Sequence, residues 1–313
     1  MQTIAIHTSK GGVGKTTLTV NLSYELAARG YKVLVIDLDD QANSSLYLGV
    51  NRASELDNAK SIDEFNSILQ SFRDRKEIID FLEADINSID FNYKDYIKVD
   101  SPFNQLVGRI NSTGRIDVLP SSYRTKENDT LSKFAGGPIR EKRLDRALRK
   151  TEIANIYDYV IIDTPPNLTT VGLNGLYAAR YLIVPTQLEY FSVYGVTSII
   201  TTLKKGVQYE TEEQAEGPRS KVLGIVPMMV EPKNRNRVNK IAKQWLQQTL
   251  PPDIEIFSEI KRTSSFPDAT KDRLPISVFA EKKSNAGAAA IQFLKLTEEL
   301  IARINKEEST KRT

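Results

Sequence analysis

The residues best suited to chemistry lie in one run near the start of the chain. The run reads Lys-Gly-Gly-Val-Gly-Lys-Thr-Thr and follows a short apolar segment, residues 3–8. Its glycines let backbone N–H groups approach phosphate oxygens at the positive end of the helix predicted to follow. The lysine of such a loop reaches the β- and γ-phosphates, and the next hydroxyl binds Mg²⁺. The expected nucleotide-binding residues are Gly11, Gly12, Val13, Gly14, Lys15, Thr16 and Thr17.

The loop departs from the usual phosphate-loop pattern G-x-x-x-x-G-K-[ST] at its start. Ser9 occupies the position of the first glycine, and a second lysine, Lys10, precedes two glycines. Phosphoryl transfer needs positive charge near the oxygens between the β- and γ-phosphates, which an arginine finger supplies in other enzymes. Lys10 is therefore a candidate for that role.

Three carboxylates follow apolar runs that are typical of buried strands. Asp37 and Asp39 come after residues 33–36, and Asp163 comes after residues 159–162. Carboxylates at the carboxyl end of a strand beside a phosphate loop hold the water ligands of a metal or orient an attacking water. Asp163 has the position of a Walker B carboxylate. We expect a Mg²⁺ site formed by Thr16, Asp37 and Asp163.

The alternation of short apolar runs with helical patterns predicts an α/β fold. Apolar runs occur at residues 3–8, 33–36, 116–119, 159–162, 181–184, 222–226 and 254–257. Helical patterns occur at residues 16–29, 61–72, 140–154, 192–203 and 234–250. Such an order predicts a P-loop domain with a mostly parallel twisted sheet and helices on both faces. We expect one domain over residues 1–304, with an insertion at 51–114 and a polar tail at 305–313.

The composition excludes several kinds of site. The chain of 313 residues has 43 Lys+Arg and 40 Asp+Glu, which gives a net charge of +3, and it has no cysteine and one histidine. Thiolate zinc sites, cysteine-ligated iron–sulfur clusters and multi-histidine metal centres are therefore excluded. The single histidine, His7, is expected to be a buried residue of the first strand. Without a long apolar run or a signal peptide, we expect a cytoplasmic protein.

The motifs KGGVGKTT, DLDDQ (37–41) and IIDTPP (161–166) occur in this order and are followed by Pro185, Glu189 and Gly195. Together they resemble the ParA/MinD family of deviant Walker A ATPases, over residues 1–50 and 115–300. The resemblance implies that Lys10 is the signature lysine, which reaches the phosphates of a partner across a nucleotide-sandwich homodimer. It also implies that Lys15 and Asp39 act in catalysis, with Asp39 positioning the hydrolytic water. Asp40 stands where many partition ATPases have proline.

The resemblance further implies a function and its partners. We expect ATP and Mg²⁺ as cofactors, and Pro227 and Met228 as further nucleotide-binding residues. ATP would form a homodimer that binds non-specific DNA and associates with the nucleoid. A ParB-like or other adaptor would stimulate hydrolysis, and the cargo would be a plasmid, a chromosome or a protein organelle. No membrane partner is expected.

A basic segment at residues 231–243 is the expected DNA-binding surface. It contains five basic residues and one acidic residue. The expected DNA-binding residues are Lys233, Arg235, Arg237, Lys240 and Lys243. The apolar residues of the same helix, Val238, Ile241, Trp245 and Leu246, are expected to face the core.

Two alternative functions stay open. The first is a MinD-like division-site ATPase, which binds membranes through a C-terminal amphipathic helix. Residues Ile291, Leu294, Ile301 and Ile304 form an amphipathic pattern, although a core-facing helix also explains it. The second is a metabolic P-loop enzyme of related fold, but such enzymes usually lack the lysine that Lys10 supplies. Adenine is favoured over guanine because no N-K-x-D sequence follows a late strand.

Overall fold

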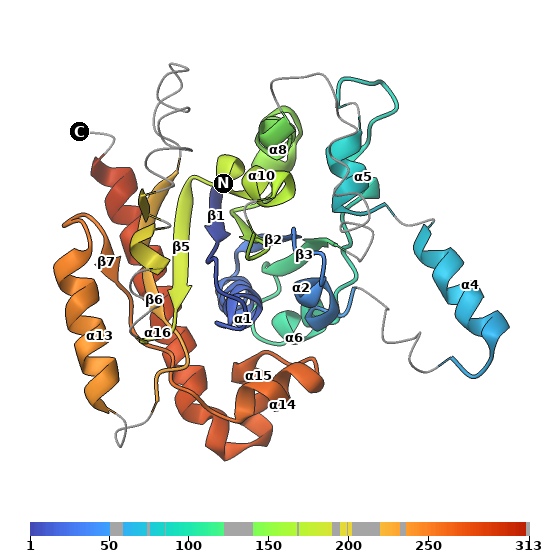
Figure 1. The fold of residues 1–313 in the computed structure, drawn as a ribbon. Helices are drawn as coiled ribbons and strands as arrows, with labels where there is room; N and C mark the ends of the chain where they lie inside the picture. Colours follow the sequence, from blue (N-terminus) through green and yellow to red (C-terminus); the bar gives the residue numbers. More distant parts are fainter. Residues whose placement is uncertain are drawn as a thin grey trace.

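The fold is taken from a computed structural model (Figure 1). The described residues are 1–50, 59–73, 76–84, 86–121, 140–167, 169–189, 195–198, 200–201, 220–231 and 236–310. The side chains of residues 69–73, 140 and 236–238 lie outside this description. The strands are β1 (Gln2–Ile6), β2 (Lys32–Asp37), β3 (Arg115–Leu119), β4 (Tyr159–Asp163), β5 (Tyr181–Thr186), β6 (Lys221–Pro227) and β7 (Glu255–Ile256).

The α-helices with assigned bounds include those predicted near residues 16–29, 61–72, 140–154 and 234–250, and several that were not predicted. They are α1 (Lys15–Ala28), α2 (Asn43–Tyr47), α4 (Ile62–Arg73), α5 (Ile78–Glu83), α6 (Phe103–Gly108), α8 (Arg143–Lys150), α9 (Ile153–Ile156), α10 (Thr170–Ala178), α13 (Asn236–Thr249), α14 (Ser265–Lys271), α15 (Ile276–Lys282) and α16 (Gly287–Thr310). The helix expected at 140–154 is divided into a 3₁₀ turn, α8 and α9. Of the helix expected at 192–203, residues 195–198 and 200–201 are described, and they are helical.

The described strands form one seven-stranded sheet in the order β3-β2-β4-β1-β5-β6-β7. Every neighbouring pair is parallel. Strand β2 shows why the apolar runs predicted this sheet: Leu34 and Ile36 point into one core, whereas Val33 and Val35 point into the other. Helices α5, α8, α10 and α13 cover the first face, and α1, α6, α15 and α16 cover the second. The predicted fold class is confirmed.

The segment predicted as an insertion contributes largely to the core. Phe103 on α6 is 1% exposed, and its ring packs edge-on against Tyr24 at 6.2 Å and Tyr47 at 6.0 Å between centroids. Phe81 on α5 is also 1% exposed. The described parts of residues 76–114 therefore belong to the nucleotide-binding body, because their buried aromatic residues pack against its elements.

Helix α4 is the part of this segment that stands apart from the body (Figure 1). The amphipathic helix predicted at 61–72 is confirmed. Two of its described apolar residues nevertheless do not face the core, since Ile62 is 77% exposed and Phe65 is 39% exposed.

The stripe predicted on α13 is oriented differently from the expectation. Leu246 and Ala242 are buried, at 1% and 3% exposure, whereas Ile241 and Trp245 are 40% and 42% exposed. The prediction that Ile241 and Trp245 face the core was wrong; Val238 lies outside the described side chains. The buried face of the helix includes Leu246, as predicted, together with Ala242, which the prediction did not include.

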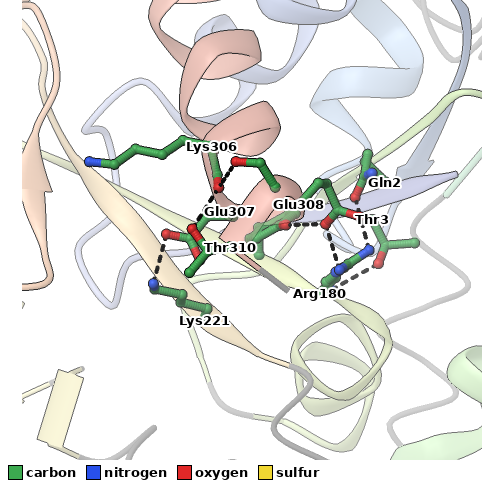
Figure 2. Close-up of polar contacts among 10 residues, drawn as sticks. Gln2, Thr3, Arg180, Lys221, Lys306, Glu307, Glu308 and Thr310 are labelled. Atoms are coloured by element: carbon green, nitrogen blue, oxygen red, sulfur yellow. Dashed lines mark hydrogen bonds and ion pairs between the residues drawn. The ribbon is translucent and has the colours of Figure 1, made fainter. Parts of the chain in front are cut away.

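Helix α16 continues to Thr310, so residues 305–310 of the expected polar tail are helical. Its last turns are fixed to the amino ends of two strands (Figure 2). Lys221 donates to Glu307 at 2.8 Å, and Arg180 lies 2.5 Å from Glu308. No helix among the described residues is long and apolar enough to cross a membrane.

The predicted amphipathic stripe on α16 is only partly buried. Ile304 is 1% exposed and belongs to the core, whereas Ile291 and Leu294 are 66% and 38% exposed. Leu296 and Leu300, which are buried at 2% and 0% exposure, complete the core-facing side.

Candidate nucleotide site

The phosphate loop connects the end of the central strand β1 to the start of α1. Two of its glycines have backbone conformations that favour glycine, with φ of 71° at Gly12 and 93° at Gly14. A Cβ at Gly14 would also lie 2.9 Å from the Met228 methyl group. Because β1 is parallel to its neighbours, the loop lies at the same edge of the sheet as the segments that follow β2 and β4.

A cavity of about 730 Å³ opens at this edge. Its lining includes Gly11, Gly12, Gly14, Lys15, Thr16 and Thr17 from the loop, Asp39, Asp40, Gln41 and Asn43 after β2, Pro165, Pro166 and Asn167 after β4, and Met229 after β6. The predicted phosphate-loop residues are thus brought together, except that the side chain of Val13 is buried at 1% exposure. The volume suits a small organic ligand.

The predicted metal ligands Thr16 and Asp163 are in contact. The Thr16 hydroxyl donates to Asp163 Oδ2 at 3.0 Å, and the Ser44 hydroxyl donates to the same oxygen at 2.6 Å. The other oxygen, Oδ1, is buried without a hydrogen-bond partner among the described residues. A buried carboxylate oxygen is costly to leave without a partner, and Mg²⁺ takes oxygen ligands and waters. Thr16 and Asp163 therefore fit a Mg²⁺ ion, which would neutralise phosphate charge.

Asp37 holds the local backbone rather than facing the cavity. Its Oδ2 accepts from the backbone N–H and the hydroxyl of Ser45, at 2.8 and 2.7 Å. Its Oδ1 accepts from the Asp39 backbone N–H at 3.1 Å. The carboxylate is fully buried, so Asp37 fixes the turn after β2 and the start of α2. The structure places this predicted ligand behind the site, where it orients Asp39.

Burial raises the pKa of all three carboxyl groups. The pKa of Asp37 rises to about 8, first by burial and then by the negative charge of Asp163. Burial raises the pKa of Asp163 to about 6, against hydrogen bonds from Ser44 and Thr16 and the Lys15 charge. Burial also raises the pKa of Asp39. A divalent cation would favour the ionised forms, which gives the cluster a physical reason to bind one.

Asp39 is the predicted catalytic carboxylate that lines the cavity. It is 9% exposed, and its Oδ1 accepts from the Gln41 backbone N–H at 3.0 Å. That contact holds the carboxylate in place while leaving further lone pairs for a water.

Comparisons with known proteins decide the family. The family model AAA_31, described as an AAA domain, matches residues 1–215. The chain belongs to this family. An uncharacterized protein from Methanocaldococcus jannaschii is 30% identical over 306 residues, which are 97% of this chain and 100% of the relative. The sporulation initiation inhibitor protein Soj of Bacillus subtilis is 32% identical over 208 residues, 64% of each chain.

A solved structure has the same fold. McdA from Cyanothece, in complex with ATP, superposes with a TM-score of 0.70 at 19% identity, covering 96% of both chains. That structure shows the fold, and the family match and the likeness to Soj show the rest: the protein is a ParA/MinD-type P-loop ATPase, as its motifs predicted, with ATP and Mg²⁺ as its ligands.

In this ParA/MinD-type ATPase the predicted signature lysine does not line its own cavity. The Lys10 ammonium donates to Glu189 Oε2 at 2.7 Å and to Gln187 Oε1 at 3.1 Å. Its side chain is 47% exposed. Lys15, in contrast, is 8% exposed and lines the cavity. The two lysines thus have separate positions, one within the site and one at its rim.

At the end of β6, the residues that line the cavity differ from those selected in the sequence analysis. Met228 is 1% exposed and lies beneath Gly14, and Pro227 pairs with Thr186 inside the sheet. Met229, which the sequence analysis did not select, lines the cavity and has a φ of 53°. The sequence analysis also did not select Ser44 and Ser45. These two hydroxyl residues follow the DLDDQ motif after two positions, and that closeness to the carboxylates could have indicated them.

Proposed function

We propose that this ATPase positions a cargo by ATP-controlled binding to DNA. ATP joins two copies into a homodimer, the dimer binds non-specific DNA of the nucleoid, and a ParB-like or other adaptor stimulates hydrolysis. The position of Lys10 is the main support for this proposal. A cation that lies at the rim of the site and outside its own cavity is available to the phosphates of a second copy.

Residues of both copies take part in the hydrolysis of each ATP. Within one copy, backbone N–H groups and Lys15 bind the phosphates, Thr16 and Asp163 hold Mg²⁺, and Asp39 orients the attacking water. Lys10 of the second copy compensates charge on the oxygens between the β- and γ-phosphates as the bond breaks. Neither copy is complete without the other, so nucleotide state controls dimerisation.

The proposed DNA surface lies on and before α13. Lys240 is exposed, and Lys243 is 41% exposed with its ammonium 3.6 Å from Glu259. Lys233 and Arg235, together with the side chain of Arg237, lie outside the described residues. Non-specific affinity grows with the number of phosphates neutralised. Two such faces in a dimer double that number and make the second contact intramolecular.

The other basic cluster, at residues 140–150, is less available for DNA. Arg149 bonds to Asp145 at 2.9 Å, and Arg143 donates to the Leu82 carbonyl at 2.7 Å. Lys150 donates to Asn87 at 2.8 Å. These cations already have partners within the chain, which favours the α13 surface.

DNA binding by the Asp39→Ala variant tests the proposal. This variant keeps ATP because it cannot orient the water, so its dimer should accumulate and bind DNA of any sequence in the presence of ATP only. Adding Lys240→Glu should weaken binding to all sequences alike and flatten the salt dependence by about one to two units of slope. Lys295→Glu is the matched control, because Lys295 is 65% exposed on the opposite face of the sheet.

Three outcomes contradict the proposal. DNA binding that does not depend on ATP contradicts the proposed control of DNA binding by the nucleotide. An unchanged salt slope in the Lys240→Glu variant places the DNA surface elsewhere. Binding to anionic vesicles instead of DNA supports the membrane alternative, which the contacts of Glu307 and Glu308 at the end of α16 disfavour.

A further inference from the structure

The side chain of His7 joins the strand before the phosphate loop to the segment after Asp163. His7 directly follows β1 and is 1% exposed. Its backbone N–H donates to the Ile183 carbonyl of β5 at 3.1 Å. Its ring Nδ1 lies 2.8 Å from the Thr164 hydroxyl, and Thr164 is the residue after Asp163. One residue therefore connects the end of β1 to the middle of β5 and to the residue that follows β4, in three strands that are neighbours in the sheet.

The direction of these hydrogen bonds follows from their partners. The Thr164 hydroxyl donates to the Ile6 carbonyl at 2.9 Å, and a carbonyl oxygen can only accept. The hydroxyl has one proton, so its oxygen accepts from Nδ1–H of His7 when both bonds form. Nε2 of His7 is buried without a hydrogen-bond partner in the part of the chain that the structure describes. The ring thus donates from Nδ1 to Thr164 and also interacts with the backbone of the next residue, Pro165.

Thr164 is also confined on its other side. A Cβ at Gly175 of α10 would lie 2.9 Å from the Thr164 methyl group, so the helix backbone lies directly against it. The segment that leads from Thr164 to α10 includes Pro165, Pro166 and Asn167, which line the cavity. Any movement of Thr164 therefore moves one wall of the nucleotide site.

We propose that His7 is a positioning residue that acts through Thr164 and keeps Asp163 in register with the phosphate loop. Asp163 accepts hydrogen bonds from Thr16 and Ser44 at one oxygen, and its other oxygen is buried without a partner among the described residues, which suits it to the water ligands of a Mg²⁺ ion. Partners behind a metal ligand fix its orientation, and their loss commonly weakens metal binding. The phosphates are bound by the loop itself, so His7 affects the Mg²⁺-dependent part of nucleotide binding. This role is independent of the proposed dimer and DNA.

Two pairs of substitutions separate the hydrogen bond from packing. His7→Leu fills the ring volume without a donor, whereas His7→Asn keeps an N–H near the position of Nδ1. Thr164→Val removes the hydroxyl, and Thr164→Ser keeps it. The full-length variants are titrated with Mg²⁺ in the presence of a fluorescent ATP analogue, and the affinity for the analogue alone is measured in EDTA. Thermal unfolding with the analogue, with and without Mg²⁺, gives a second readout.

We expect His7→Leu and Thr164→Val each to need about tenfold more Mg²⁺ for half-saturation. Both should keep their affinity for the analogue in EDTA and lose part of the Mg²⁺-dependent rise in Tm. His7→Asn and Thr164→Ser should resemble the wild type. The double variant His7→Leu/Thr164→Val should be no worse than either single variant, because both remove the same contact.

Unchanged Mg²⁺ requirements in His7→Leu and Thr164→Val overturn the proposal. Additive effects in the double variant overturn it as well, since the two residues would then act separately. Equal losses with and without Mg²⁺ show general damage to the site and also contradict it. If His7→Leu does not fold, the comparison of Thr164→Val with Thr164→Ser tests the proposal by itself. Equal Mg²⁺ requirements in these two variants then refute the proposal.

Discussion

The ammonium of Lys10 lies 2.7 Å from a carboxylate oxygen of Glu189, a residue 179 positions later in the same chain. The lysine proposed to act on a second copy is thus held by its own subunit at the exit of β5. Both side chains are about half exposed, at 47% and 59%, and an exposed ion pair contributes only about 0–1 kcal/mol. The contact therefore opposes dimerisation weakly, and ATP binding can overcome it.

Glu189→Gln should lower the ATP concentration needed for dimerisation. The substitution removes the charge that holds Lys10, so half-maximal dimer should form at up to about fivefold less ATP. Light scattering during an ATP titration measures this. Glu298→Gln is a matched control, because Glu298 is an exposed partner of Arg29 at 3.6 Å, far from the site. A higher ATP requirement in Glu189→Gln would show that Glu189 belongs to the dimer interface instead.

The stability of the metal-free protein should rise as the pH falls from 8.5 to 6.5. Burial and Asp163 raise the pKa of Asp37 to about 8, so the folded state binds a proton that the unfolded state lacks. Above that pKa the folded state bears the full cost of the buried charge, and below it the protonated carboxyl removes this cost. The free energy of unfolding should therefore rise by at most about 1.4 kcal/mol for each pH unit below the pKa. Thermal unfolding in EDTA measures this dependence.

Two comparisons control this pH experiment. Asp37→Asn should flatten the dependence, and Mg²⁺ with a nucleotide should reduce it. His7 has the opposite effect below about pH 6.5. Burial and the Lys15 charge lower its pKa to about 4, so the unfolded chain binds a proton that the folded chain does not. The contribution of His7 therefore lowers stability as the pH falls from about 6.5 to 4. Tm values that fall steadily from pH 8.5 to 6.5 in EDTA are inconsistent with a buried Asp37 carboxylate.

Two phenylalanines in the segment predicted as an insertion should differ sharply in their effect on stability. Phe103→Ala should cost about 3–5 kcal/mol of unfolding free energy, because the ring is 1% exposed between Tyr24 and Tyr47. Phe65→Ala on α4, where the ring is 39% exposed, should change it by no more than about 0.5 kcal/mol. Urea unfolding of both variants tests this. Similar costs for the two substitutions contradict the packing described here.

The strands and the phosphate loop were predictable because each has a strong local signal. A strand buried on both faces needs a continuous apolar run, as residues 33–36 show, and a phosphate loop needs glycines at fixed positions. The core role of residues 76–114 had no such signal. Its aromatic residues, such as Phe81 and Phe103, are irregularly spaced and are buried by contacts with distant elements.

Orientation and long-range pairing were the parts that the sequence could not supply. Ile241 and Ala242 are adjacent on α13, and only tertiary packing decides which of them faces the core. The Lys10–Glu189 and His7–Thr164 contacts join residues 179 and 157 positions apart, which no local pattern reveals. Resemblance to known ATPases indicated the phosphate loop and its carboxylates, but it did not indicate that Asp37 accepts hydrogen bonds from the backbone N–H groups of Ser45 and Asp39, whereas Asp163 accepts from the hydroxyls of Thr16 and Ser44.

The oligomeric state of the protein in the presence of ATP, measured by sedimentation velocity, tests the central claim most directly. Asp39→Ala with ATP should sediment as a stable dimer without turnover, and the wild type should form a dimer that decays as ATP is consumed. Lys10→Ala should bind ATP through Lys15 yet sediment as a monomer, because the cation supplied to the second copy is missing. A Lys10→Ala protein that forms the same ATP-dependent dimer as the wild type contradicts the account.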